Sequence, residues 1–123
     1  MSLHQVIIAL GSNTDPIKNL ASANKQIGSI LSFVNTSKAL WTKPIGIKSD
    51  EFLNQLVTGE TSLSQAELEE LLKKIERVLG RTTQESRQGI IRIDIDLLKF
   101  DDKKCHIEDW SREYIKALMN NIK

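Results

Sequence analysis

The sequence predicts an α+β domain with the split β-α-β arrangement of ferredoxin-like folds, in which an antiparallel sheet carries its helices on one face. Three segments support this prediction. Val6–Leu10 is a short apolar run that stops at Gly11, as a buried central strand does. Residues 64–80 have the spacing of an amphipathic helix, and residues 90–100 alternate like a strand with two different faces.

Between these segments, the pattern predicts two more strands and another helix. Pro16 suits a first helical turn, and apolar residues recur at helical spacing as far as Leu31. Residues 33–42 and 52–61 are each predicted as one strand. The connection 43–51 is too long for a tight hairpin, so we expect it to cover a ligand.

The second half of the chain gives the clearest helix signal. Ser64 and Glu67 form a capping box, and Gly80 closes the apolar stripe that follows. Residues 81–89 are polar and lack periodicity, whereas residues 107–122 suggest a last helix. Since the order matches a split β-α-β fold, we expect the first two helices on one sheet face and a ligand on the other.

Composition narrows the class of protein. A chain of 123 residues suffices for one core, so we expect residues 1–123 to form a single domain. The 17 Lys and Arg nearly balance the 16 Asp and Glu, and a net charge of +1 gives no footprint for nucleic acid. With no membrane-length apolar run, no signal-peptide pattern and one cysteine, we expect a cytoplasmic protein that binds neither nucleic acid nor membrane.

Two aspartates on one predicted strand are the strongest candidates for chemistry. Asp94 and Asp96 flank Ile95, so the period of two puts both carboxylates on one sheet face, with Cα atoms about 6.6 Å apart. Such a pair could hold Mg²⁺ together with substrate phosphates. An Asp-x-Asp taken alone more often marks a solvated strand face, although aspartate fits strands poorly.

Arginines precede this strand. Arg81 and Arg87 lie in the polar segment and Arg92 opens the strand, so three phosphate-binding guanidinium groups are expected near the carboxylates. The alternative is a solvated charged loop.

Residues that bracket the long loop could hold a flat heterocycle. Trp41 and Phe52 offer aromatic faces, and Thr42 and Asn54 offer hydrogen bonds, although both rings suit a core equally well. The Gly11–Asn13 segment could be an anion nest or a ligand-facing turn, but an ordinary turn is favoured when it is taken alone.

Taken in order, these motifs resemble the hydroxymethyldihydropterin pyrophosphokinase family over roughly the first hundred residues. The resemblance rests on residues 8–13, 42–46, 52–54, 75–81 and 93–98. It implies a protein that transfers pyrophosphate from ATP to 6-hydroxymethyl-7,8-dihydropterin in folate biosynthesis and releases AMP.

The resemblance also assigns residues. Asp94 and Asp96 would hold two Mg²⁺ ions, and catalysis would rest on them and on Arg81, Arg87 and Arg92. ATP, the co-substrate, would contact Arg81, Arg87 and Arg112. The pterin would contact Thr42, Pro44, Ile45, Phe52 and Asn54. Asn13 and Glu76 would support the site from beneath.

This chain departs from the family pattern in two places. Where the family usually has Arg-Trp-Gly-Pro-Arg, the chain reads Arg87-Gln88-Gly89-Ile90-Ile91-Arg92, and a shift of one residue reverses a strand side chain unless a bulge re-aims it. The family's later proline-histidine segment, which contacts the nucleotide, is absent, and Arg112 and Tyr114 are possible counterparts of the residues that follow it.

These departures keep two alternatives open. One is a catalytically inactive relative that binds a pterin or nucleotide or serves as a partner module. The other is an unrelated ferredoxin-like regulatory or RNA-binding domain, whose sheet should display aromatic residues instead of aspartates.

Overall fold

The computed structural model describes residues 3–44 and 50–122, and its strands form one antiparallel sheet. The strands follow the order β2-β4-β1-β5-β6, and β3 also pairs with β4. Their bounds are β1 His4–Ser12, β2 Ser32–Thr36, β3 Leu40–Thr42, β4 Phe52–Thr61, β5 Asp94–Phe100 and β6 Lys103–Lys104. The predicted α+β class is confirmed.

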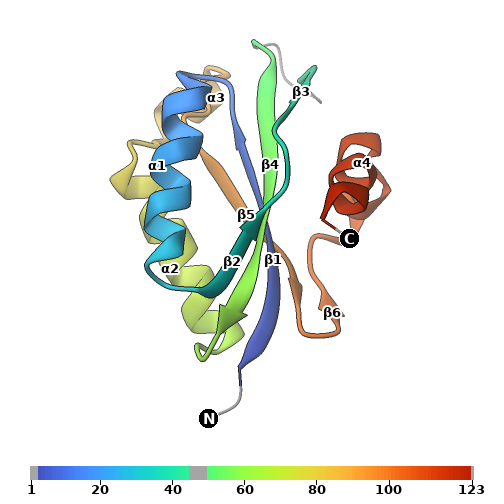
Figure 1. Cartoon of the computed structure of the whole chain (residues 1–123). Helices are drawn as coiled ribbons and strands as arrows, with labels where there is room; N and C mark the ends of the chain where they lie inside the picture. The colour runs from blue at the N-terminus through green and yellow to red at the C-terminus, as the bar shows by residue number, and fades with distance from the viewer. Residues whose placement is uncertain (1–2, 45–49, 123) are drawn as a thin grey trace.

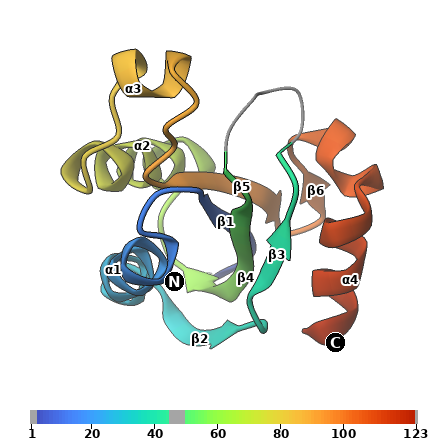
Figure 2. The same ribbon diagram turned by 90° about the horizontal axis from the view of Figure 1, so that it is seen from above.

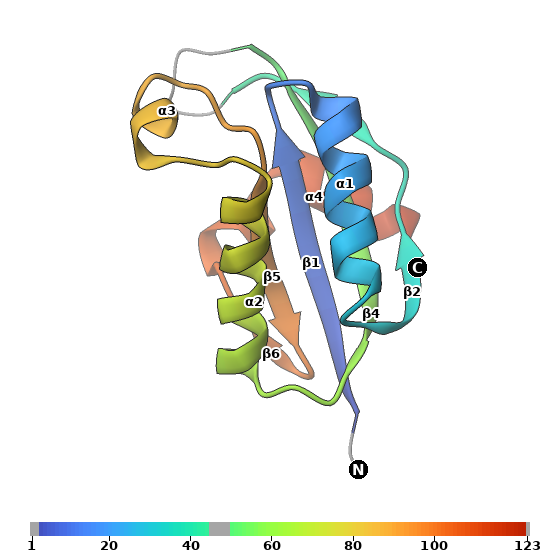
Figure 3. The same ribbon diagram turned by 90° about the vertical axis from the view of Figure 1, so that its left-hand side faces the viewer.

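Helices α1 (Pro16–Gly28) and α2 (Gln65–Val78) lie side by side on one face of the sheet (Figures 1 and 3). Both carry the predicted start signals: Pro16 stands in the first turn of α1, and Ser64 and Glu67 form the capping box of α2. Their apolar stripes close the main core against β1, β4 and β5. Its fully buried side chains include Ile8, Leu10, Ile27, Leu68, Leu72, Ile93 and Ile95.

The other face of the sheet carries α4 (Glu113–Asn121), which follows the 3-10 helix η1 (Ile107–Ser111) (Figure 2). A second, smaller core forms where Leu56 and Leu98 of the sheet meet Ile115 and Leu118 of α4. The face that the sequence left for a ligand is therefore shared with a helix.

The predicted strand at 33–42 is two strands. The β2 pairing with β4 shifts register between Ser32 and Asn35. At the break after β2, the Ser37 backbone N–H donates to the Leu56 carbonyl, and the Ser37 hydroxyl accepts from the Leu56 N–H at 2.8 Å. A serine side chain thus replaces a ladder bond, which interrupts the strand without leaving a buried donor unpaired.

Element ends differ elsewhere too. The first strand extends past Leu10 to Ser12, and the first helix ends at Gly28 instead of Leu31. The polar stretch 81–89 contains a short helix, α3 (Thr83–Arg87), whose Thr82 hydroxyl accepts from the Glu85 N–H. No helix in the described ranges is long and apolar enough to cross a membrane.

Candidate active site

The sheet register brings distant residues into two rows on the α4 face. Gly11 of β1 pairs with Asp94 on one side and Asn54 on the other. Two residues earlier, Ala9 pairs with Asp96 and Leu56. Because alternate strand residues share a face, Asp94 and Asp96 lie on the same face, as the sequence predicted.

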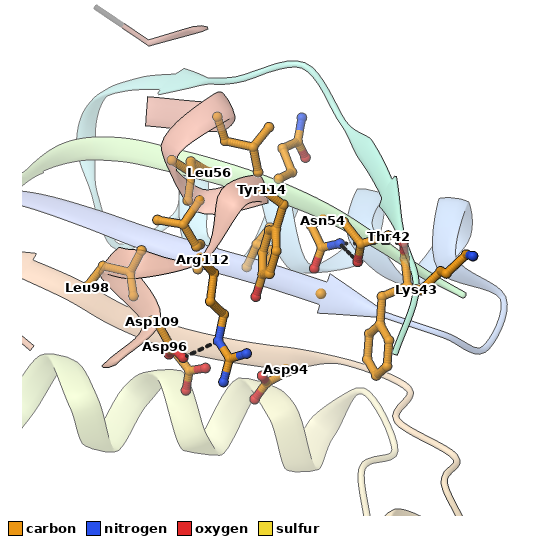
Figure 4. Close-up of a pocket in the computed structure, with 17 residues that line it drawn as sticks. Thr42, Lys43, Asn54, Leu56, Asp94, Asp96, Leu98, Asp109, Arg112 and Tyr114 are labelled. Atoms are coloured by element: carbon orange, nitrogen blue, oxygen red, sulfur yellow. Dashed lines mark hydrogen bonds and ion pairs between the residues drawn. The ribbon is translucent and has the colours of Figure 1, made fainter. Parts of the chain in front are cut away.

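A pocket of about 190 Å³ opens over these rows, between the sheet and the start of α4 (Figure 4). One wall holds Tyr114 of α4 and Arg112, the residue just before α4, and the Arg112 Nε donates to Asp109 at 3.0 Å. The sheet supplies an acidic end, formed by Asp94 and Asp96, and an amide end, formed by Asn54. Its lining from the sheet includes Ala9, Gly11, Thr42, Phe52, Asn54, Leu56, Asp94, Asp96 and Leu98.

The two carboxylates at the acidic end repel each other. Burial of Asp96, and then the charge of neighbouring Asp94, raise the pKa of the Asp96 carboxyl to about 7. The opposing charges of Lys73 and His106 lower it only in part. A divalent cation between two such carboxylates would relieve their repulsion, so the donor set fits Mg²⁺.

The number of donors also fits a metal that arrives with phosphate. Among residues 3–44 and 50–122, no group of three or more His, Cys, Asp or Glu side chains could hold a metal ion. Mg²⁺ usually takes one or two carboxylates together with substrate phosphates instead of an all-protein cage. Asp94 and Asp96 match that mode of binding.

A buried glutamate and an arginine secure the open edge of β5 next to these carboxylates. Glu76 of α2, 4% exposed, accepts the Ile95 N–H at 2.6 Å. The Arg81 guanidinium donates to the Ile93 carbonyl at 3.3 Å, to Glu76 at 3.2 Å and to Asp94 at 2.8 Å. Together they satisfy an edge that has no neighbouring strand there, so they fix where Asp94 stands.

Neighbouring carboxylates stabilise the charged form of Arg81. Burial opposes its charged form, but the hydrogen bond and charge of Asp94, together with Glu76, outweigh that penalty and raise the pKa of Arg81. The guanidinium therefore stays protonated beside Asp94, but Arg81 does not line the pocket itself; it lines a neighbouring hollow with Lys73 and Glu76.

The amide end of the pocket is held in one orientation. The Asn54 Nδ2 donates to the Thr42 hydroxyl at 2.7 Å and to the Leu40 carbonyl at 3.3 Å. Asn54 is buried, and Phe52 lines the same pocket. With its NH₂ group occupied by β3, the Asn54 Oδ1 is the atom left to accept from a ligand.

Gly11 keeps the floor between the two ends flat. A Cβ at this position would lie 3.1 Å from the Asn54 Oδ1 and 3.7 Å from the Phe52 ring. Gly11 and Ser12 belong to β1, and the segment is not a turn that forms an anion nest. Gly11 matters because a side chain at this position would press against Asn54.

Asn13 acts below the site, on the loop that leads into β5. Its Nδ2 donates to the Gly89 carbonyl at 2.6 Å, and its Oδ1 accepts the Ile91 N–H at 2.7 Å. The Asn13 backbone N–H also donates to the Ile91 carbonyl at 3.0 Å, so Asn13 ties this loop to the end of β1, and β5 begins at Asp94 and not at the predicted residue 90. A role for Asn13 in supporting the site stays a prediction.

The other predicted site residues lie outside the pocket. Arg87 is exposed on α3, and Arg92 donates through Nε and Nη2 to Glu85 at 2.8 and 2.9 Å. Of the three arginines expected near the carboxylates, only Arg81 contacts one.

On the pterin side, Trp41 points to the opposite face from Thr42 and is 52% exposed. Pro44 does not line the pocket, and Ile45 falls outside the described residues.

Sequence reasoning missed the surroundings of Asp96. Lys73 Nζ and His106 Nε2 lie 3.8 and 3.9 Å from its Oδ1. Lys73 lies three residues before Glu76 on one face of α2. Since Glu76 contacts the Ile95 N–H of β5, this face of the helix also brings Lys73 toward Asp96. His106 reaches it from the segment between β6 and η1, where it is the residue just before the 3-10 helix, a contact that no sequence spacing signals.

Fold and site together define a ferredoxin-like α+β protein with a polar pocket that suits a metal–phosphate ligand at one end. The model of the family described as 7,8-dihydro-6-hydroxymethylpterin-pyrophosphokinase (HPPK) matches residues 7–123, and the chain belongs to this family. The resemblance inferred from its motifs is confirmed.

Named relatives agree with this assignment. The chain is 35% identical over 105 residues to the Bacillus subtilis 2-amino-4-hydroxy-6-hydroxymethyldihydropteridine pyrophosphokinase, covering 82% of this chain and 62% of that one. It is 29% identical over 135 residues to the Porphyromonas gingivalis protein of the same name, covering 95% and 89%. An Arabidopsis thaliana folate synthesis bifunctional protein is 30% identical over 127 residues, covering 94% of this chain and 26% of the plant protein. The chain thus spans about a quarter of that plant relative and less than two thirds of the Bacillus enzyme.

Proposed function

We propose that this protein transfers pyrophosphate from ATP to 6-hydroxymethyl-7,8-dihydropterin and releases AMP, as a step in folate biosynthesis. The observation that carries the proposal is that Gly11 pairs with Asp94 on one side and with Asn54 on the other. This pairing brings the acidic end and the amide end into one pocket. Family membership makes the pterin the acceptor to test first.

The amide end suits a pterin. A pterin is a flat bicycle rimmed with ring N–H groups and acceptors, and the Asn54 Oδ1 and the Thr42 hydroxyl, which lie side by side, would form hydrogen bonds with such an edge. Phe52 and Tyr114 offer ring faces, and Gly11 leaves the floor clear. With its polar ring edge at Asn54 and Thr42, the pterin would direct its hydroxymethyl group toward Asp94 and Asp96.

At the acidic end, the chain's own groups organise the phosphates. Mg²⁺, proposed to enter with ATP as two ions, would be held by Asp94 and Asp96 and would neutralise phosphate charge. Arg81, which donates to Asp94, and Arg112, which lines the pocket, would donate to phosphate oxygens. The acceptor hydroxyl oxygen would bond to the β-phosphorus while its proton passes to water. The bond between that phosphorus and the oxygen that bridges it to the α-phosphorus would break, and AMP would leave with that oxygen.

Turnover tests the proposal directly. AMP release is measured by chromatography with ATP, Mg²⁺ and the pterin, for the natural chain, Asp96→Ala and the exposed control Asp102→Ala. We expect pterin-dependent AMP, a loss of about 10³-fold in Asp96→Ala, and natural activity in Asp102→Ala. AMP formation that survives both Asp94→Ala and Asp96→Ala would overturn the assigned roles.

The alternative of an inactive relative rests on a specific observation. The guanidinium of Arg92 is held by Glu85, and Arg87 is exposed on α3, so two of the expected phosphate ligands lie away from the pocket. Calorimetry that shows pterin or nucleotide binding, with no AMP formed at high protein concentration, would favour that alternative.

A further inference from the structure

A second concave site lies on the α4 face, beyond the acidic pocket. It runs between the first residues of β1, the end of β5, β6 and the outer side of α4, and its volume is about 780 Å³. That size falls within the range of small-molecule pockets, about 300–1,000 Å³. Ile115 lines both pockets, so α4 forms a partition between them.

The floor and walls of this groove are apolar. Three partly buried side chains line the groove and pack against the smaller core: Ile7 of β1, Met119 of α4 and Ile122, the residue just after α4. Trp110 adds an indole, whose Nε1 donates to the Cys105 carbonyl at 3.0 Å and so fixes the ring in place. A ligand body that binds here must itself be apolar or aromatic.

Its rim is cationic. Lys99 of β5, Lys104 of β6 and Lys116 of α4 all line the groove, and the Lys104 ammonium lies 4.6 Å from the centre of the Trp110 ring. Within the described part of the chain, none of the three lysines has a carboxylate within ion-pair distance. Three such charges are notable in a chain whose net charge is only +1.

The one acidic residue on this rim is already engaged. Asp101 accepts from the Gln5 N–H at 2.9 Å and pairs with the His4 Nδ1 at 2.7 Å. Among the described residues no ion pair joins Asp101 to Lys99, Lys104 or Lys116, and one carboxylate beside three lysines leaves the rim with an excess of positive charge. An anionic ligand would complement that charge.

From these observations we propose that the groove beside Trp110 binds a small amphipathic anion, with an aromatic or aliphatic body against Ile7, Met119 and Trp110 and a carboxylate or phosphate among Lys99, Lys104 and Lys116. This site does not depend on the pyrophosphokinase function. A ligand that binds only the folded chain also bridges α4 and the sheet, so it raises the melting temperature.

The test uses 2-naphthoate as the probe and 2-naphthalenemethanol as its uncharged counterpart. Binding is followed by chemical shifts of the backbone amides and of the tryptophan indole N–H groups in ¹H–¹⁵N spectra of the whole chain. The melting temperature is measured with and without the probe. The variant Lys104→Glu/Lys116→Glu changes two exposed rim charges, and Lys18→Glu/Lys25→Glu makes the same change in charge on α1, on the opposite sheet face.

We expect saturable shifts centred on Trp110, Ile7 and Met119, an affinity for naphthoate lowered about tenfold or more in the rim variant, and no change in the α1 variant. The naphthalenemethanol should bind more weakly than naphthoate. Shifts centred instead on Asn54 and Tyr114, equal affinity in the rim and α1 variants, or no saturation at millimolar probe would each overturn the proposal.

Discussion

The two faces of the sheet differ in what fills them. The α1/α2 face is closed by a continuous apolar core that includes Leu68 and Leu72 of α2, Ile95 of β5 and Ile93 just before β5. Within residues 3–44 and 50–122, the core on the α4 face has four buried residues, and the acidic pocket and the lysine-rimmed groove lie on the same face. One face holds the fold together, and the other leaves backbone and side chains available to ligands.

The largest effect should come from breaking the closed face. Leu72→Ala removes a side chain that is 1% exposed in the main core, and should lower the free energy of unfolding by about 3–4 kcal/mol. Leu118→Ala, in the smaller core, should cost about 2–3 kcal/mol because the neighbouring groove lets the site relax. Urea denaturation of both variants checks the comparison, which fails if Leu118→Ala costs more.

Glu76 links the two faces, and its replacement should have the next largest effect. Glu76→Gln keeps the shape but removes the charge that Lys73 and Arg81 share, so it should lower the free energy of unfolding by about 1–3 kcal/mol. Exchange of the Ile95 amide with deuterium should accelerate with it. Glu70→Gln, at an exposed position of the same helix, should do neither.

A change in the floor of the pocket should separate binding from stability. Gly11→Ala places a methyl group 3.1 Å from the Asn54 Oδ1, so the amide must shift and the pterin affinity should fall about tenfold. Calorimetric titration with the pterin measures this loss. Gly28→Ala, where a Cβ meets nothing within 4 Å, is the control, and an equal loss there would contradict the role of the floor.

The smallest expected effect concerns how the protonation of Asp96 changes the free energy of unfolding with pH. Because burial raises its pKa from 3.8 to about 7, the folded chain binds this proton more tightly than the unfolded chain. The group therefore makes the free energy of unfolding decrease as pH rises between about 4 and 7.

Asp96→Asn removes that titration. Without divalent cations, the variant should match the natural chain near pH 4 and exceed its free energy of unfolding by about 1–2 kcal/mol at pH 8. Denaturation across this pH range measures the difference. A constant offset between the two chains, or the same slope change in the exposed control Asp102→Asn, would refute the explanation.

Strong local signals made much of the fold predictable. The capping box at Ser64 and Glu67, the apolar run of β1 and the alternation through Ile93 and Ile95 each specify an element within a few residues. The break between β2 and β3 was not predictable, because it depends on Ser37 meeting the Leu56 backbone across the sheet.

The candidate site shows the same division. The shared face of Asp94 and Asp96 follows from a period of two, and Thr42, Asn54 and Phe52 were found from the residues that bracket one loop. The contacts of the arginines were not predictable in the same way. Arg81 contacts Asp94, whereas Arg92 binds Glu85, and nothing in their spacing distinguishes the two.

By itself, the sequence determined the helices, the central strands and the common face of the two aspartates, since each depends on residues close together in the chain. Only the tertiary structure decided what those aspartates meet. Lys73, His106 and Arg112 approach the pocket from a helix, a turn and the start of another helix, and α4 divides that sheet face into two sites. Such contacts depend on packing between distant segments, which no local pattern of residues specifies.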